Sequence, residues 1–213
     1  IEFYGKDKLF MPAEQVNLLF RYRGAGANVK PSLSKMGGYA WEKTKSKAKK
    51  EVESIAQDLL ILYAKRQMSE GITFDPDTNW QFEMEDAFEF TETTDQMKAI
   101  EDTKFDMEQT KPMDRLICAD VGFGKTEVAL RAIFKAVMSG YQTALVAPTT
   151  VLALQHFKTF EERFKPFSVK VELMSRFKSK KEQKATLERL KNGECDVVIG
   201  THRLLQDGIV FKD

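Results

Sequence analysis

RLICADVGFGKTE, residues 115–127, is the stretch that decides the fold of this chain. It opens with an apolar run typical of a buried strand, and the helical pattern of residues 125–139 begins directly after its glycines. Gly122 and Gly124 allow backbone N–H groups to turn toward an anion, and a helix N-terminus adds partial positive charge. A strand, a Gly-rich turn that ends in Lys-Thr, and a helix in this order predict a phosphate-binding loop.

This loop predicts a nucleotide site that uses Mg²⁺. We expect Lys125 to reach the β- and γ-phosphates and the Thr126 hydroxyl to bind Mg²⁺, which makes these two residues the catalytic candidates. Ala119 stands where the pattern G-x-x-x-x-G-K-T has its first glycine. The alternative, a Gly-rich turn without a ligand, is disfavoured because strand, loop, Lys-Thr and helix are in register. The loop residues expected to hold the nucleotide are Ala119, Asp120, Val121, Gly122, Phe123, Gly124, Lys125, Thr126 and Glu127.

An upstream segment supplies candidates for binding the base. Phe90 and Gln96 stand in F-x-x-T-x-x-Q spacing. A glutamine amide offers both a donor and an acceptor to an adenine edge, and Phe90 can lie against the ring. Thr93 and Gln96 also have the spacing of a capping box for a helix that runs to about Met107. These two interpretations are equal by themselves, and the phosphate loop downstream favours adenine recognition.

Beyond residue 110 short strands alternate with helices, which predicts an α/β fold with a parallel sheet covered by helices on both faces. In such a fold the ligand edge lies at the carboxyl ends of the strands. Ser179 and Glu182 have the spacing of a capping box. The expected strands are residues 115–118, 143–147, 169–174 and 196–199, and the expected helices are residues 125–139, 150–164 and 179–191.

Two segments at strand carboxyl ends are candidates for holding a nucleic-acid backbone, because they present hydroxyls and backbone amides beside the phosphate loop. The basic segment 176–191 is nearby and can attract DNA, although a charged helix surface explains it nearly as well. His202 and His156 have no partner spaced for catalysis, so we interpret His202 as structural or as a backbone contact. The DNA candidates are Pro148, Thr149, Thr150, Arg176, Gly200, Thr201 and His202.

The first third of the chain has a different pattern. Residues 1–22 alternate as in a β-hairpin that stops at Pro12, and residues 24–40 have the Gly-rich composition of a connecting loop. Residues 41–69 repeat apolar positions at helical spacing, with Gly71 placed as a C-terminal cap. The lysines early in this helix are interpreted as a solvated face rather than as phosphate contacts. Residues 75–108 then carry twelve acidic residues, a surface that DNA should avoid.

Composition excludes several classes of protein. The chain has 213 residues, of which 42% are hydrophobic and 31% charged, so one ordinary core plus a small extra unit is expected. The net charge is +1, so contact with nucleic acid must be local rather than driven by overall charge. Two cysteines without paired spacings indicate neither a disulfide framework nor a zinc site, and a reducing cytoplasm fits. No apolar run reaches the roughly 20 residues that span a bilayer.

Taken together, the motifs resemble the first RecA-like motor domain of a superfamily 2 helicase or translocase. The phrases MDRLICADVGFGKTEVALRA, APTTVLALQHF, MSRFKSKKEQ and IGTHRLLQ, with GGYAWEKTKSKAKKEV upstream, resemble the family of bacterial transcription-repair coupling factors over nearly the whole chain. The resemblance implies residues 1–24 as the end of a Tudor-like domain that binds RNA polymerase. It further implies residues 25–70 as a Gly-rich linker with a long helix, and residues 71–213 as the first part of the motor.

That family implies a cytoplasmic bacterial protein that uses ATP and Mg²⁺ to translocate on double-stranded DNA. It displaces RNA polymerase stalled at a lesion, and regions absent here recruit an excision-repair damage-recognition protein. The chain begins at Ile1 without an initiator Met, and no acidic Walker B phrase precedes Asp213, so we expect an internal segment that hydrolyses no ATP alone. The alternatives are a branch-migrating superfamily 2 helicase and a module that only binds RNA polymerase.

Overall fold

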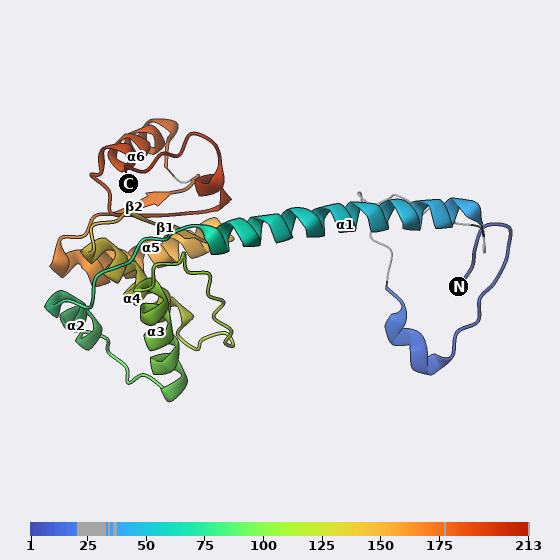
Figure 1. The fold of residues 1–213 in the computed structure, drawn as a ribbon, viewed down its shortest axis with the longest axis horizontal. Coiled ribbons are helices and arrows are strands. Elements are labelled where there is room, and N and C mark those ends of the chain that lie inside the picture. The colour runs from blue at the N-terminus through green and yellow to red at the C-terminus, as the bar shows by residue number, and fades with distance from the viewer. Residues whose placement is uncertain (21–32, 34, 36–37, 177, 213) are drawn as a thin grey trace. The chain divides into compact units, whose positions relative to one another are not determined.

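The computed structural model describes residues 1–20, 33, 35, 38–176 and 178–212. The chain divides into two compact units, Ile1–Arg66 and Gln67–Asp213, which are described separately (Figure 1). Most of the connecting loop predicted over residues 24–40 lies outside the described residues. None of the helices in the described ranges is long and apolar enough to cross a membrane.

The N-terminal hairpin is shorter than its sequence pattern predicts. Glu2 and Lys8 form an isolated antiparallel bridge around a turn in which Gly5 and Lys6 have φ of +90° and +71°. After Pro12, where the prediction ends the returning strand, the chain forms a 3₁₀ helix, η1 (Ala13–Leu18), so the hairpin is confirmed around its turn and does not extend over the rest of residues 1–22. Proline has no N–H for a strand ladder, and its fixed φ suits the start of a helix.

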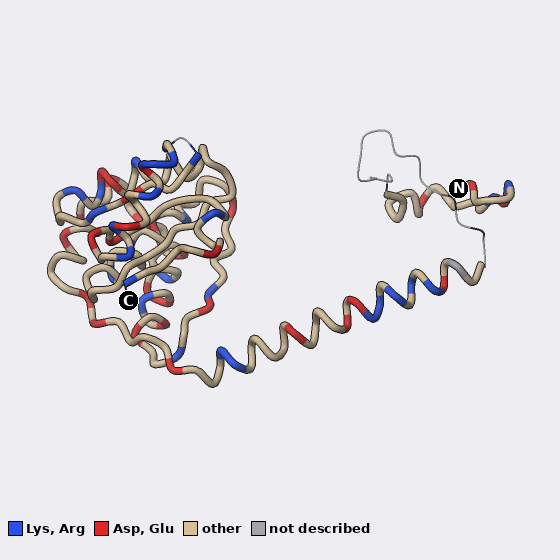
Figure 2. Tube along the Cα trace, turned by 90° about the horizontal axis from the view of Figure 1, so that it is seen from above, with Lys and Arg blue, Asp and Glu red and all other residues tan. Residues whose placement is uncertain are grey.

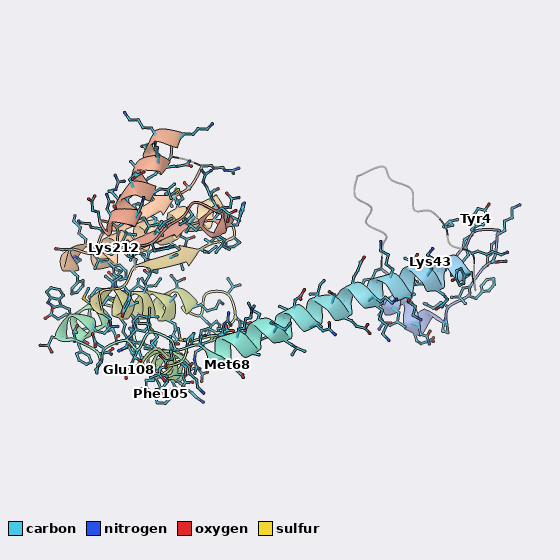
Figure 3. All side chains as sticks on the ribbon, turned by 45° about the horizontal axis from the view of Figure 1, so that its top comes forward. Tyr4, Lys43, Met68, Phe105, Glu108 and Lys212 are labelled. Atoms are coloured by element: carbon cyan, nitrogen blue, oxygen red, sulfur yellow. The ribbon has the colours of Figure 1, made fainter. Side chains whose placement is uncertain are left out.

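The long helix predicted over residues 41–69 is confirmed as α1 (Tyr39–Met68). Both signs of charge occur along it (Figure 2), including the spaced pairs Lys47–Glu51 and Lys49–Glu53 at 3.8 Å. Such pairs stabilise an exposed helix by a few tenths of a kcal/mol each, about 0.2–0.5. Side chains stand out along the whole of α1 (Figure 3), and the apolar positions at helical spacing are exposed.

Gly71 does not cap α1, which corrects the prediction for this residue. Its backbone lacks the left-handed conformation that a capping glycine adopts. Instead its N–H donates to the carbonyl of Thr110 at 2.7 Å, and a Cβ placed on it would lie 2.5 Å from the backbone nitrogen of Pro112. Glycine is therefore required here by close packing of two backbone segments rather than by helix termination.

The second unit contains a three-stranded parallel sheet and five α-helices within the described residues. The strands β1 (Thr143–Val146), β2 (Val171–Met174) and β3 (Val197–Gly200) lie in the order β1-β3-β2, with Leu145, Ile199 and Leu173 in register. The helices are α2 (Asn79–Asp86), α3 (Thr94–Met107), α4 (Lys125–Met138), α5 (Thr150–Phe164) and α6 (Lys180–Asn192), with short 3₁₀ turns η2 (Lys165–Phe167) and η3 (His202–Leu205).

These bounds confirm every predicted helix and strand after residue 140 to within two residues. The helix α2 was missed, because its eight residues are too few to show a clear period.

Hydrophobic side chains bury both faces of the sheet. On one face Phe134 of α4 and Phe160 of α5 pack against Val197 and Ile199. On the other, Leu190 of α6 packs against Val198 together with Met174. Helices α4 and α5 therefore lie on the opposite side of the strands from α6 (Figure 1), which confirms the α/β class with helices on both faces.

The strand predicted over residues 115–118 is not formed, and residues 113–120 have no regular secondary structure. A strand needs a neighbour that pairs its N–H and C=O groups. Within the described part of the chain, the sheet consists of β1, β3 and β2 alone, and none of them pairs with this segment. Instead Arg115 forms ion pairs with Asp106 at 2.6 Å and Asp102 at 3.3 Å, and Leu116 is 85% exposed.

Candidate functional site

The predicted phosphate loop leads directly into α4. Gly124 is the N-cap with φ of +73°, and Gly122 has φ of +86°, conformations that L side chains rarely adopt. The Lys125 ammonium donates to the carbonyl oxygens of Ala119 and Asp120, each at 2.6 Å. These bonds hold its positive charge over the loop, at the positive end of a helix dipole.

A pocket of 620 Å³ joins the loop to the upstream segment. It brings together six of the predicted nucleotide residues from two stretches of sequence, while Ala119, Asp120, Val121, Phe123 and Lys125 belong to the loop but not to the pocket wall. The predicted residues that line it are Phe90, Gln96, Gly122, Gly124, Thr126 and Glu127.

Gln96 connects the first turn of α3 to the phosphate loop. Its carbonyl accepts from the N–H of Thr93 at 2.8 Å, and the Thr93 hydroxyl accepts from the Gln96 N–H, so the capping box is present. Its amide nitrogen donates to the carbonyl of Phe123 at 3.0 Å, and a Cβ on Gly124 would lie 2.5 Å from that nitrogen. A side-chain amide has two N–H donors and two lone pairs, so capping leaves further capacity for an adenine edge.

The residues of this site fit a nucleoside triphosphate. Two glycines in positive φ, one ammonium and a helix N-terminus form the donor set that binds phosphate. Thr126 lines the pocket, and the described residues include no group of three His, Cys, Asp or Glu that holds a metal. Magnesium bound here would therefore rely on the Thr126 hydroxyl and on oxygen ligands from the phosphates and water, as Mg²⁺ commonly does.

Two buried cations on α4 were missed by the sequence analysis. The side chains of Arg131 and Lys135 are each 2% exposed. Arg131 pairs with Glu85, Glu92 and Glu127. Lys135 binds the carbonyl of Asp75 and the carboxylates of Asp77 and Glu108, all within 2.8 Å. The signal was available: both cations share a helix face with Phe134, and the preceding segment is strongly acidic.

The pKa shifts follow this pairing. Burial lowers the pKa of Arg131 and of Lys135, but the hydrogen bonds that they donate to their carboxylate partners outweigh it, and both pKa values are raised. The Arg131 hydrogen bond lowers the pKa of Glu92. For Asp77, burial raises the pKa, but bonds from Lys104 and Lys135 prevail and lower it. All of these groups are charged near neutral pH. Four of the twelve acidic residues of segment 75–108 pair with the two buried cations of α4, namely Asp77, Glu85, Glu92 and Glu108.

The predicted DNA residues meet in a second hollow, a groove of 830 Å³ at the carboxyl ends of the strands. We call it the basic groove. Gly200 precedes its Thr201, and a Cβ on Gly200 would lie 2.6 Å from the carbonyl of Met174, so glycine permits this close packing. The lining includes six predicted residues and further cations, namely Pro148, Thr149, Thr150, Arg176, Thr201, His202, Lys178, Lys180, Lys184 and Arg203.

Local hydrogen bonds position the walls of the basic groove. The Thr149 hydroxyl caps α5 by accepting from the Leu152 N–H at 3.2 Å. The predicted capping box of Ser179 and Glu182 is confirmed at the start of α6. The buried Gln183 amide donates to the carbonyls of Ser175 at 3.1 Å and Lys178 at 2.7 Å, which fixes the turn that carries Arg176.

The two histidines lie at different places in the second unit. Burial lowers the pKa of His156, which lies within α5. His202 is exposed at the start of η3 and lines the basic groove. Its role, structural or as a backbone contact, stays a prediction.

Comparison with known proteins places this arrangement in context. A family model described as DEAD/DEAH box helicase matches residues 93–213. The transcription-repair-coupling factor of Bacillus subtilis (strain 168) is 49% identical over 213 residues, which is 100% of this chain and 18% of that protein. The factor of Mycobacterium bovis (strain ATCC BAA-935 / AF2122/97) is 54% identical over 207 residues, 97% of this chain and 16% of that protein. The chain therefore spans under a fifth of these relatives.

A solved structure is also similar. The structure of RecG bound to a three-way DNA junction matches with a TM-score of 0.67 and 36% sequence identity. The match covers 71% of this chain and 21% of the RecG chain. The fold of the matched part is thus similar to that of a protein whose structure contains DNA.

Proposed function

The chain belongs to the DEAD/DEAH box helicase family, and on that premise we propose that it forms the nucleotide-binding part of an ATP-driven translocase on double-stranded DNA. In the longer protein this motor displaces RNA polymerase stalled at a lesion and couples transcription to nucleotide excision repair in the bacterial cytoplasm. The observation that carries the proposal is the phosphate loop with its pocket, in a chain similar along its whole length to transcription-repair-coupling factors.

In the proposed site, different residues bind the phosphates, the magnesium ion and the base. Lys125 and the loop N–H groups bind the phosphates of ATP, and Thr126 binds Mg²⁺, which supplies charge neutralisation when bound. Phe90 and Gln96, which line the same pocket, bind the adenine base. Glu127, which was expected to contact nucleotide, is held by Arg131 and Arg163, so we assign it to the support of the site.

The basic groove is the second part of the proposal. Its hydroxyls at positions 149, 150 and 201 and its exposed cations suit a phosphate backbone, which is recognised mainly through charge and hydrogen bonds. Glu172 neutralises Lys178 and Arg189 at 2.9 Å and 2.7 Å, so Arg176, Lys180 and Lys184 supply most of the attraction. We therefore assign DNA binding to Pro148, Thr149, Thr150, Arg176, Gly200, Thr201 and His202 with these lysines.

The proposal is tested with the full-length protein and a transcription elongation complex stalled on DNA. Release of polymerase is followed with ATP, without ATP, and with Lys125→Ala. Release that requires both ATP and Lys125 supports the coupling function. The 213-residue chain serves as a control that turns over no ATP, because hydrolysis needs the Asp and Glu of an acidic Walker B phrase, which this sequence does not contain. ATP-independent release, or release by Lys125→Ala, contradicts the proposal.

The likeness to RecG favours one second candidate, a helicase that remodels branched DNA. The same assay separates the two functions when a three-way DNA junction is added. ATP-dependent remodelling of the junction without polymerase release assigns the chain to that alternative. The excision-repair partner and the polymerase contact then have no role in its function.

A further inference from the structure

We propose that Arg131 is a positioning residue for the base half of the nucleotide site. It holds residues 88–93 against α4 so that Phe90 and Gln96 face the bound base. The inference rests on the proposed function, because it assigns a role within the same site. With 2% of its side chain exposed, Arg131 acts through its neighbours and does not touch the nucleotide.

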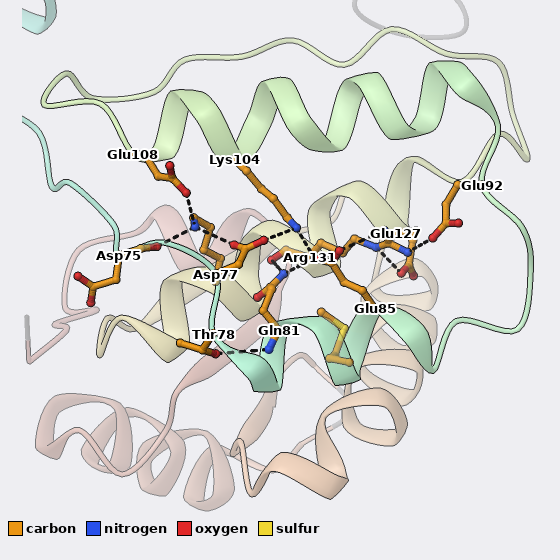
Figure 4. Close-up of polar contacts among 12 residues, drawn as sticks. Asp75, Asp77, Thr78, Gln81, Glu85, Glu92, Lys104, Glu108, Glu127 and Arg131 are labelled. Carbon is orange, nitrogen blue, oxygen red and sulfur yellow. Dashed lines mark hydrogen bonds and ion pairs between the residues drawn. The ribbon is translucent and has the colours of Figure 1, made fainter.

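Arg131 joins three segments through three carboxylates (Figure 4). Its Nε donates to Glu127 at 3.0 Å, one residue beyond Thr126. One terminal nitrogen donates to Glu92, and the other lies 3.5 Å from Glu85 near the end of α2. A single guanidinium therefore connects the phosphate-loop helix to the segment that carries the base-binding side chains.

The aromatic side chains depend on the same arginine. The Arg131 guanidinium carbon lies 5.6 Å from the ring centroid of Phe88, and that of Arg163 lies 5.4 Å from it. Cations at this distance from a ring centroid are attracted to its face. Phe88 in turn meets Phe90 edge-on, with ring centroids 5.5 Å apart. Phe90 is 71% exposed and lines the pocket, so its position relies on Phe88 rather than on burial.

The polar side of the base site depends on Glu92. Glu92 directly precedes Thr93, whose N–H binds the Gln96 carbonyl. The Gln96 amide nitrogen then reaches the carbonyl of Phe123 in the phosphate loop. Loss of the bond between Arg131 and Glu92 would free the chain just before the capping box and loosen Gln96 relative to the loop.

Only an arginine suits this position. Its guanidinium presents five N–H donors in a rigid planar fork and can serve several carboxylates together with an aromatic face. A lysine in its place would keep the charge but would supply a compact point charge on a flexible stem. Arg131→Lys therefore tests geometry separately from charge.

Lys135 offers a matched control. It lies one turn further along α4, is buried to the same extent, and is likewise held by carboxylates, Asp77 and Glu108. Neither partner lines the nucleotide pocket. Lys135→Met thus removes an equally buried charge from the same helix without touching residues 88–93.

The experiment measures binding of ATP and of inorganic tripolyphosphate to the 213-residue chain by calorimetry, below the melting temperature of every variant. For the unmodified chain we expect ATP to bind at least tenfold more tightly than tripolyphosphate. Arg131→Lys should reduce this ratio about tenfold with tripolyphosphate affinity unchanged. Glu92→Gln, at a position whose side chain is 23% exposed and which is less prone to misfold than the buried arginine, should reduce the ratio in the same direction. Lys135→Met should leave the ratio unchanged.

The outcomes separate this inference from the proposed function. Tripolyphosphate binding that is lost in Lys125→Ala supports the phosphate site whatever Arg131 does. An unchanged ratio in both Arg131→Lys and Glu92→Gln overturns the positioning role alone. Equal affinity for ATP and tripolyphosphate in the unmodified chain overturns the positioning role together with the base-binding role of Phe90 and Gln96, and leaves the phosphate site standing. Binding of neither ligand overturns both. A ratio that falls equally in Lys135→Met also overturns it, because general destabilisation then explains the loss.

Discussion

The second unit uses charge in two opposite ways. In the ion-pair cluster, formed by Asp77, Glu85, Glu92, Lys104, Glu108, Glu127, Arg131, Lys135 and Arg163, cations and carboxylates are largely removed from water and paired with each other. In the basic groove, cations such as Arg176 and Lys184 are exposed. The ion pairs of the cluster connect α2, α3 and α4, whereas the exposed cations of the basic groove can contact a ligand.

The net charge of the chain does not show which charged side chains are paired with each other and which are exposed to a ligand. The chain has a formal charge of +1, and six of the twelve acidic residues of segment 75–108 form ion pairs with cations of the second unit. Removing one partner of a buried pair leaves the other without compensation, which costs far more than removing an exposed charge. The two regions should therefore respond to charge removal in different measurements, one in stability and the other in DNA affinity.

The largest effect is expected from Lys135→Met. This change leaves Asp77 and Glu108 without their shared cation and should lower the free energy of unfolding by about 3 kcal/mol. Denaturant unfolding of the chain, followed by circular dichroism, measures the difference. Lys98→Met is the matched control, because Lys98 is exposed in the same lobe, and it should change stability by no more than about 0.5 kcal/mol. Equal effects of the two variants would show that burial of the pair does not matter.

An intermediate effect is expected in the basic groove. Lys180 and Lys184 have no carboxylate partner among the described residues, so the double variant Lys180→Ala/Lys184→Ala should leave stability nearly unchanged. Its affinity for duplex DNA should fall about tenfold, and the slope of log affinity against log salt should decrease by about 2. Fluorescence anisotropy at several salt concentrations measures both.

The control for the groove removes the same charge elsewhere. Lys47→Ala/Lys49→Ala changes two lysines of α1 that pair with Glu51 and Glu53. If α1 is a solvated face, this variant keeps its DNA affinity. A comparable loss in both double variants would mean that DNA binding follows overall charge, and the basic groove would have no special role.

The sequence was most informative where local chemistry determines structure. The Lys-Thr loop, the caps at Thr93 and Ser179 and the alternation of strands and helices predicted the class of fold and the helix bounds, because these features depend on neighbours in sequence. It failed at residues 115–118, whose apolar pattern is suited to a strand but finds no partner within the described residues. Strand formation depends on a distant segment, which a local pattern does not report.

The local sequence pattern also did not predict the ion pairs that support the nucleotide site, which join Arg131 to carboxylates far away in the sequence. Arg131 contacts residues up to 46 positions away, at Glu85, and α2 brings that carboxylate to it. The acidic excess of segment 75–108 predicts a surface that DNA avoids, and counting charges does not show which of these carboxylates pair with buried cations. Only the packing of α2 and α3 on α4 shows that these carboxylates neutralise Arg131, Lys135 and Lys104.

The smallest effects are expected from substitutions of Thr149, whose hydroxyl both caps a helix and lies in the basic groove. Its hydroxyl accepts from the Leu152 N–H and caps α5, and it also lines the basic groove. A hydroxyl has two lone pairs and one donor, so it can cap the helix and still donate to a DNA phosphate.

Thr149→Ala loses the cap and should cost about 1 kcal/mol of stability. Thr149→Asp keeps a capping oxygen but places a negative charge in the groove, so it should retain stability while DNA affinity falls. Thr149→Ser should preserve both properties in the same unfolding and anisotropy measurements. If Thr149→Asp binds DNA as well as the unmodified chain, the phosphate backbone does not approach α5, and the groove must bind DNA through the α6 side alone.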